Sequence, residues 1–229
     1  MAELDFTALR QRMLAEIAAK TIFVCAQLGK AALGRRVMDA MAEVPRHEFV
    51  PFELRPLAYV DSPLPIGFGK TISQPFIVAL MTDLLALDAG TSVLEIGTGL
   101  GYQAAVLAEL AGKVYSVEIL EELADQAKQR LRRERYSNIE FKIGNGYYGW
   151  PEHAPYDRII VTAAPDLIPP PLIEQLKPGG KMVIPAGLAD AQRLVLVEKD
   201  LTGALTTTEL LPVRFTQLEG TESGSSSAS

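Results

Sequence analysis

The sequence predicts an α/β protein with a mostly parallel sheet, an N-terminal helical addition and a C-terminal antiparallel hairpin. A short apolar strand at 93–96 runs into a glycine-rich turn that opens a helix. Strand-like and helical runs then alternate, which is typical of a parallel sheet covered by helices on both faces. Finally, two β-rich runs at 193–198 and 205–215 are joined by a turn at 200–203, which predicts a closing hairpin.

Residues 6–44 are predicted to be largely helical. Apolar residues are spaced for one helix face at Leu9, Met13 and Ile17, and the same spacing returns near residue 40. Between these runs, residues 21–26 are apolar on several faces. Their pattern fits a buried helix and a buried strand equally well, so both alternatives stay open.

Residues 45–75 are rich in proline and glycine and are predicted to be irregular. A long irregular stretch in a compact domain is unusual unless it binds a ligand. It ends in TISQP at 71–75, after which the apolar run 76–85 predicts a buried helix with Pro75 in its first turn. Spacing alone therefore favours Ser73 as a helix cap over a functional role.

The remaining elements follow from local periodicity. We expect strands at 114–118, 139–143, 156–161 and 181–185, and helices at 121–135 and 172–176. The tail at 220–229 is small and polar and is predicted to be disordered.

The glycine turn itself indicates the ligand. Gly97, Gly99 and Gly101 read G-x-G-x-G, without the longer spacing of a dinucleotide site, and Glu95 just before them would repel phosphate and suit a cation. Glu118 ends the next strand about 20 residues later, where a carboxylate can accept both ribose hydroxyls. An adenosine with a positive centre points to S-adenosylmethionine.

Asn145 follows the third strand, between two glycines, at the sheet edge where ligands gather. It suits a turn, and its side-chain carbonyl also suits an adenine amino group. The only two histidines, His47 and His153, lie in loops beside prolines, which gives little support for a Ser-His-Asp triad or a histidine metal site.

Composition sets further limits. The 229 residues are 48% hydrophobic, enough for one main α/β domain, and carry a net charge of −6, which gives no overall basic field for nucleic acid or an anionic membrane. The single cysteine, Cys25, excludes an intrachain disulfide and a cysteine-rich metal site. No apolar run approaches the roughly 20 residues of a membrane span. We therefore expect a cytoplasmic protein without a metal.

Residues 37–218 resemble the protein-L-isoaspartate (D-aspartate) O-methyltransferase family, repair enzymes that methylate isoaspartyl residues in damaged proteins. The loop LEIGTGLGYQAA at 94–105 and LKPGG at 176–180 are shared by many class I methyltransferases. The narrower motifs are VPR at 44–46, FVP at 49–51, LPIG at 64–67, TISQP at 71–75 and VTAAP at 161–165.

The resemblance implies a class I S-adenosylmethionine-dependent, Rossmann-like fold. It divides the chain into an N-terminal helical and loop extension at 1–75 that contributes to the substrate site, a methyltransferase domain at 76–219 and the tail. It makes Ser73 the active-site residue. It assigns Thr71, Ile72, Val213 and Phe215 to the substrate, and Glu95, Gly97, Thr98, Gly99, Gln103, Glu118 and Asn145 to the cofactor.

The family usually has aspartate at position 145, so cofactor affinity is expected to be somewhat weaker here, and residues 20–35 are less typical of the family. The implied partners are isoaspartyl proteins and peptides bound by a monomer, without metal, nucleic acid or membrane. The alternatives are another class I methyltransferase, acting on a small molecule or nucleic acid, and a cofactor-binding protein without catalysis.

Overall fold

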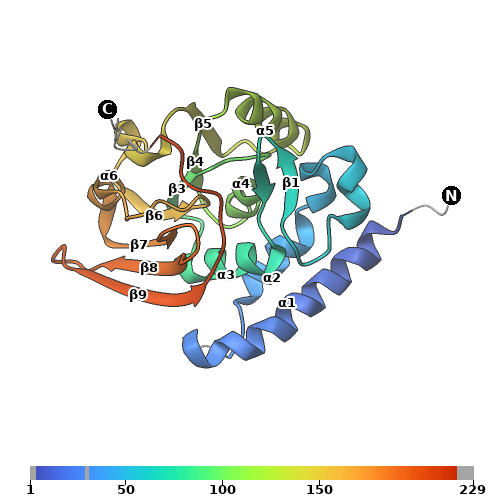
Figure 1. The fold of residues 1–229 in the computed structure, drawn as a ribbon, viewed down its shortest axis with the longest axis horizontal. Helices are drawn as coiled ribbons and strands as arrows, with labels where there is room; N and C mark the ends of the chain where they lie inside the picture. The colour runs from blue at the N-terminus through green and yellow to red at the C-terminus, as the bar shows by residue number, and fades with distance from the viewer. Residues whose placement is uncertain (1–3, 29–30, 221–229) are drawn as a thin grey trace, which may run out of the picture.

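The computed structural model describes residues 4–28 and 31–220 and is built around one seven-stranded sheet (Figure 1). The strand order is β5-β4-β3-β6-β7-β8-β9. Strands β3 to β7 are parallel to one another, whereas β8 is antiparallel to both β7 and β9. The predicted mostly parallel sheet with a closing hairpin is therefore confirmed.

The strands follow the predicted order. They are β3 (Ser92–Ile96), β4 (Lys113–Glu118), β5 (Ile139–Ile143), β6 (Tyr156–Val161), β7 (Leu176–Ala186), β8 (Arg193–Lys199) and β9 (Leu205–Pro212). The chain moves outward from β3 to β5 and returns to β6 on the other side of β3. Ligands of open α/β sheets bind where the strand order reverses, at the carboxyl ends of the strands. Here that position lies beyond Ile96 and Val161.

The N-terminal part packs helices against one face of this sheet. It contains α1 (Phe6–Leu28), α2 (Arg35–Glu43) and α3 (Pro75–Leu85), followed later by α4 (Tyr102–Ala108) and α5 (Glu121–Arg133). Every residue of α3 is buried, because it lies between the sheet and the N-terminal helices. The element that follows TISQP is thus the most enclosed helix of the described chain.

The two faces of the sheet are covered unequally. One core cluster joins helices α1 to α5 to the sheet through residues such as Val93 and Val183. The other face, with Leu94 and Val161, is covered by the short helix α6 (Pro170–Glu174) and by the segment carrying the 3-10 helices η3 (Gly146–Tyr148) and η4 (Pro151–His153). Helices therefore cover both faces of the sheet, as predicted, but the second face is covered only by short helices.

Residues 45–75 are more regular than predicted. They form two 3-10 helices, η1 (Arg46–Phe49) and η2 (Phe52–Leu57), and an antiparallel hairpin of β1 (Leu64–Gly67) and β2 (Lys70–Ile72). Such elements are hard to predict from sequence, because a 3-10 turn or a three-residue strand is too short to show a period. The many prolines and glycines of this stretch instead suggest an irregular loop.

The ambiguous run 21–26 belongs to α1, and its predicted burial is wrong at two positions. Ile22 and Phe23 are 70% and 84% exposed. Helix α1 lies along the outside of the molecule, so it buries a single stripe, which includes Met13, Ile17 and Thr21 (Figure 1). Apolar residues beside that stripe remain in solvent.

Several predicted boundaries shift, among them the start of β7, which lies at Leu176 rather than at residue 181. Helix α6 begins and ends two residues earlier than predicted, because β7 already begins at Leu176. Strand β9 ends at Pro212 rather than at residue 215, since proline lacks the N–H that would continue the ladder. Helix α5 ends at Arg133. Most of the tail predicted to be disordered, 221–229, lies outside the described residues.

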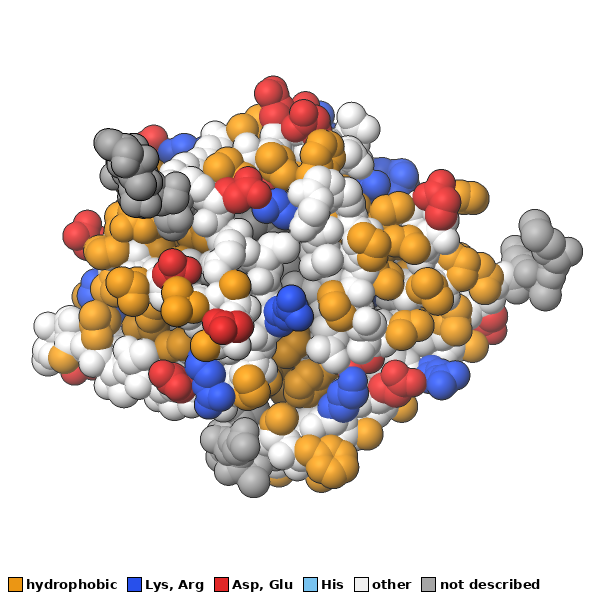
Figure 2. Space-filling model, in the orientation of Figure 1, with side chains coloured by type: hydrophobic (Ala, Val, Ile, Leu, Met, Phe, Trp, Pro, Cys, Tyr) orange, Lys and Arg blue, Asp and Glu red, His pale blue; other side chains and the backbone are white. Residues whose placement is uncertain are grey.

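Acidic and basic side chains are interspersed with hydrophobic ones on the face shown in Figure 2, without a single basic field on that face. Among the described residues no helix is long and apolar enough to cross a membrane.

Candidate active site

Two pockets lie at the carboxyl edge of the sheet and meet at three threonines. The inner pocket, with about 550 Å³ of empty space, is lined by the ends of β3, β4 and β6. The outer cleft, with about 1090 Å³ and partly open to solvent, is lined by residues from 71–77 and 211–216. Thr71, Thr162 and Thr216 line both. The arrangement allows a group held in one pocket to reach a group held in the other.

The glycine loop forms the floor of the inner pocket. Gly97, Gly99 and Gly101 all have positive φ, of 97°, 55° and 95°. A Cβ on Gly97 would lie 2.4 Å from the hydroxyl oxygen of Thr162, and one on Gly101 would lie 2.8 Å from Leu131. Glycine is required at these two positions by the backbone conformation and by the close approach of β6 and α5.

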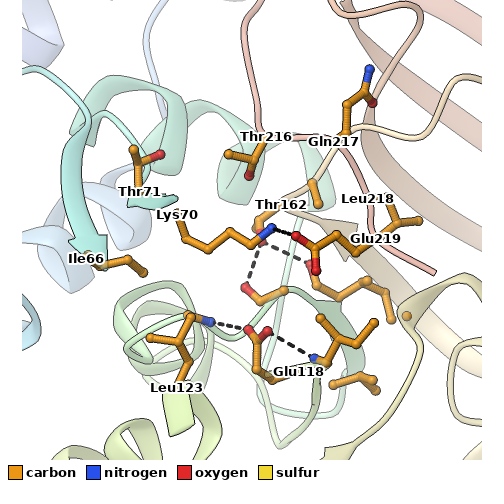
Figure 3. A pocket seen from close by; sticks show the side chains of 17 residues that line it. Ile66, Lys70, Thr71, Glu118, Leu123, Thr162, Thr216, Gln217, Leu218 and Glu219 are labelled. Atoms are coloured by element: carbon orange, nitrogen blue, oxygen red, sulfur yellow. Dashed lines mark hydrogen bonds and ion pairs between the residues drawn. The ribbon is translucent and has the colours of Figure 1, made fainter. Parts of the chain in front are cut away.

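Glu118 is tied to the same loop (Figure 3). Its Oε2 accepts from Gly99 N at 2.8 Å, and its Oε1 accepts from Ile119 N at 3.0 Å and from Leu120 N at 3.1 Å. The carboxylate lines the inner pocket, at the end of β4. Because a carboxylate oxygen can accept two hydrogen bonds, Oε2 keeps acceptor capacity toward the pocket.

Glu95 lies beneath the loop and does not line the inner pocket. Ser116 donates a hydrogen bond to its Oε2 and also contacts the Thr98 hydroxyl at 2.6 Å, while Oε1 has no partner in the described part of the chain. Burial raises the pKa of Glu95 to about 8. A protonated carboxyl is therefore the main form at neutral pH.

The other predicted cofactor residues differ in position. Gln103 is buried and donates to the Thr82 hydroxyl of α3 at 2.9 Å. Asn145 caps η3, since its Oδ1 accepts from Tyr147 N at 2.9 Å and its Nδ2 donates to Gly220 O at 2.7 Å. Of the seven predicted cofactor residues, the structure brings Gly97, Gly99 and Glu118 to the pocket lining.

Ser73 lines the outer cleft, and its interpretation as a helix cap is wrong. The N-cap of α3 is Gln74, which makes no side-chain cap. The capping acceptor comes from a distant residue, because Asp61 Oδ1 accepts from Phe76 N at 2.8 Å. The Ser73 hydroxyl has no hydrogen-bond partner within residues 4–28 and 31–220.

Thr71, Val213 and Phe215 also line the outer cleft, so Ser73 and Phe215 come from two separate segments of its lining. Ile72 is buried in the core and lines neither pocket. Strand alternation explains this, because neighbouring side chains of β2 point to opposite sides. The structure therefore brings three of the four predicted substrate residues together with Ser73.

Arg46 is a site-related residue that sequence reasoning did not single out. It is fully buried, donating from Nη2 to Ser73 O at 2.7 Å and from Nε to Ala58 O at 2.8 Å, and its guanidinium lies 4.7 Å from the Tyr102 ring centroid. Burial lowers its pKa to about 10, so it stays charged at neutral pH. The available signal was its place in the proline-flanked run 44–51, which includes the VPR motif at 44–46.

Thr162 and Thr216 were also missed as lining residues. The Thr162 hydroxyl lies 2.8 Å from Gly97 O and 3.0 Å from Ile96 O and shares its one hydrogen between them, which fixes the glycine loop against β6 (Figure 3). Lys70 of β2 and Glu219 form an ion pair in the lining of the inner pocket. No group of three or more metal-ligating acidic, histidine or cysteine side chains occurs among the described residues.

A sequence profile of the protein-L-isoaspartate(D-aspartate) O-methyltransferase (PCMT) family matches residues 21–223. The chain belongs to this family. It is 69% identical to protein-L-isoaspartate O-methyltransferase 1 of Polaromonas sp. over 98% of this chain and 95% of that protein. It is 57% identical to the Cupriavidus necator protein of the same name, over 92% and 82%.

Solved structures agree with this assignment. A protein-L-isoaspartate O-methyltransferase structure matches with a TM-score of 0.78 and 32% identity, over 92% of this chain and 66% of that chain. A Plasmodium falciparum structure described as a putative protein of the same kind, in complex with S-adenosyl-L-homocysteine, has a TM-score of 0.77 and 22% identity, over 95% and 99%. The predicted class I methyltransferase fold is confirmed.

Proposed function

We propose that this enzyme transfers a methyl group from S-adenosylmethionine to the free carboxylate of L-isoaspartyl and D-aspartyl residues in proteins and peptides. The observation that carries the proposal is the meeting of the two pockets at Thr71, Thr162 and Thr216. The inner pocket has the acidic and glycine residues of an adenosine site, and the outer cleft opens to solvent, as a polypeptide substrate requires.

The residues of the inner pocket fit this cofactor. Glu118 offers a charged acceptor to ribose hydroxyls at the end of β4, and Gly97 and Gly99 leave the loop backbone accessible. Glu95 does not line this pocket, but one of its buried carboxyl oxygens, Oε1, has no partner in the described chain. When bound, the cofactor supplies a methyl group on a positively charged sulfur.

The acceptor chemistry needs little from the protein. A free carboxylic acid with a pKa near 4 is ionised at neutral pH, so no general base is required. None of the residues lining the two pockets is histidine. The protein's task is to hold the carboxylate oxygen in line with the methyl group and sulfur, which can contribute several kcal/mol through positioning.

Ser73 orients the acceptor carboxylate. Its hydroxyl is uncommitted within the described chain, and its main chain is fixed by Arg46. Val213 and Phe215 line the same cleft from a second segment of the chain, which forms another wall. Isoaspartate has an extra methylene in its backbone, and the spacing between these walls fits that geometry. Normal aspartate is rejected because its carboxylate is not placed beside Ser73. The protein acts as a monomer in the cytoplasm in this proposal.

Paired peptides test the proposal directly. The enzyme is incubated with radiolabelled S-adenosylmethionine and two peptides that differ only in an isoaspartyl or aspartyl linkage. We expect a base-labile methyl ester on the isoaspartyl peptide alone. Equal labelling of both peptides, or no labelling with cofactor binding intact, would contradict it and favour another class I acceptor.

A further inference from the structure

The segment that carries Phe215 leaves the sheet at the edge of the outer cleft, whose lining begins with Leu211 and Pro212 at the end of β9. Strand β9 ends at Pro212, which lacks an N–H, and its pairing with β8 is already irregular between Arg193 and Val195. Residues 213–216 nevertheless line the cleft. Something other than a strand ladder must hold them.

Gln192 supplies the missing pairing. Its side-chain Oε1 accepts from Phe215 N at 2.6 Å, and its Nε2 donates to Phe215 O at 3.1 Å. Its backbone carbonyl accepts from Val213 N at 3.1 Å. The primary amide thus offers Phe215 one acceptor and one donor, as a neighbouring strand residue would. Gln192 is buried, so solvent cannot readily replace these bonds.

The other side of the segment is held by Ala164, three residues after the end of β6. Ala164 N donates to Thr216 O at 2.9 Å, and Leu218 N donates to Ala164 O at 2.9 Å. Gln192 and Ala164 therefore fix neighbouring residues of one segment. Of the two, only Gln192 also acts through a side chain, so its two side-chain bonds to Phe215 can be removed by substitution, while its backbone bond to Val213 remains.

We propose that Gln192 is a positioning residue for the methyl acceptor, acting through the backbone of Val213 and Phe215. Its side chain does not line the outer cleft, so it has no direct contact with an acceptor there. Displacing the Phe215 wall changes the spacing to Ser73 on which acceptor geometry depends. This inference rests on the proposed function.

A second glutamine provides a matched control. Gln175 is also buried, and its Oε1 accepts from Trp150 N at 2.9 Å while its Nε2 donates to Tyr148 O at 2.8 Å. A pair of side-chain amide hydrogen bonds, here called an amide clamp, thus also holds a loop on the other face of the sheet. No residue of that loop lines the outer cleft. Replacing either glutamine removes equivalent hydrogen bonds.

The experiment compares Gln192→Met with Gln175→Met, since methionine has similar length but no amide. Melting temperature, the Kd of S-adenosylhomocysteine, and KM and kcat with an isoaspartyl peptide are measured for both. For Gln192→Met we expect the peptide KM to rise about tenfold and the cofactor Kd to stay within about twofold. Gln175→Met should lose comparable stability and keep the wild-type peptide KM.

Gln192→Glu is a second variant, which keeps the acceptor for Phe215 N but cannot donate to Phe215 O. It should raise the peptide KM as well. A peptide KM for Gln192→Met close to that of wild type, or an equal rise in Gln175→Met, overturns the proposal.

Amide hydrogen exchange separates this inference from the proposed function. The Phe215 amide should exchange faster in Gln192→Met and remain protected in Gln175→Met, whether or not any peptide is methylated. If wild type does not methylate isoaspartyl peptides, the proposed function and the acceptor role both fail. Unchanged Phe215 protection in an active Gln192→Met enzyme would instead refute the clamp alone.

Discussion

The guanidinium of Arg46 donates a hydrogen bond to the backbone carbonyl of Ser73 at 2.7 Å. The same side chain reaches Ala58 O and lies over the ring of Tyr102, the first residue of the helix after the glycine loop. A buried arginine without an acidic hydrogen-bond partner is costly to desolvate. Arg46 therefore links Ser73, which lines the outer cleft, to helix α4, which follows the glycine loop.

Arg46→Lys should therefore impair catalysis more than folding. Lysine keeps the charge but lacks the planar fork that reaches two carbonyls at once. We expect kcat/KM for an isoaspartyl peptide to fall about tenfold or more. The control is Arg36→Lys, because Arg36 also donates to two carbonyls, Leu87 O and Leu110 O, but neither of these residues lines a pocket. Equal losses in both variants would argue against a positioning role for Arg46.

Ser73→Ala should retain a near-normal melting temperature and cofactor affinity while methylation of an isoaspartyl peptide falls strongly. The serine makes no capping bond, so its removal leaves α3 intact, whereas the acceptor carboxylate loses its orienting hydroxyl. Melting, calorimetric binding of S-adenosylhomocysteine and initial rate are measured on one preparation. Normal turnover in this variant would be incompatible with the proposed role.

Asp61→Ala should show the complementary loss of stability. Asp61 accepts from Phe76 N at 2.8 Å and from the Gln74 side chain at 3.0 Å, and it pairs with Lys20 of α1. Loss of a helix cap costs about 0.5–2 kcal/mol. Urea unfolding should give a lower free energy of unfolding for Asp61→Ala, and a smaller change for Asp61→Asn, which keeps an acceptor. Wild-type stability in Asp61→Ala would show that the cap contributes nothing.

Glu118→Ala should weaken cofactor binding. The ribose hydroxyls lose a charged acceptor, and hydrogen bonds to charged groups contribute about 1.5–3 kcal/mol. The amide of Gly99 also loses its partner, so we expect lower thermal stability as well. Calorimetric titration with S-adenosylhomocysteine is the measurement, and an unchanged Kd would remove Glu118 from the ribose site.

Glu95 should make stability depend on pH. Burial raises its pKa in the folded state from the usual 4.5 to about 8, so the folded protein binds more protons than the unfolded chain between these values. The contribution to stability is then complete below about 4.5 and is lost as the pH rises toward 8. Glutamine does not titrate and can still accept from Ser116.

The free energies of unfolding of wild type and Glu95→Gln are compared by urea unfolding from pH 5 to pH 9. The other titrating groups are the same in both proteins, so their effects cancel in the difference. The stability of Glu95→Gln relative to wild type should increase as the pH rises through this window. A difference that stays constant with pH would mean that Glu95 is not protonated in the folded state.

Local features of the sequence were enough to predict the order of strands and helices after residue 76. The glycine loop, the acid that ends β4 and the closing hairpin depend on residue type and on short periods of two or 3.6 residues. These features lie in short stretches of the chain, so the cofactor class could be inferred before any contact was known. The family was implied by the resemblance of narrower motifs, chiefly TISQP at 71–75 and VTAAP at 161–165.

The tertiary structure alone decided which side chains meet across long separations in the chain. Asp61, rather than Ser73, caps α3, and Arg46 and Gln192 reach the backbone of the two cleft walls. Ile22 and Phe23 are exposed because α1 contacts the body on one side only. Periodicity reports which face of an element is apolar, but a hydrogen-bond partner or an exposed apolar residue is set by the packing of elements far apart in sequence.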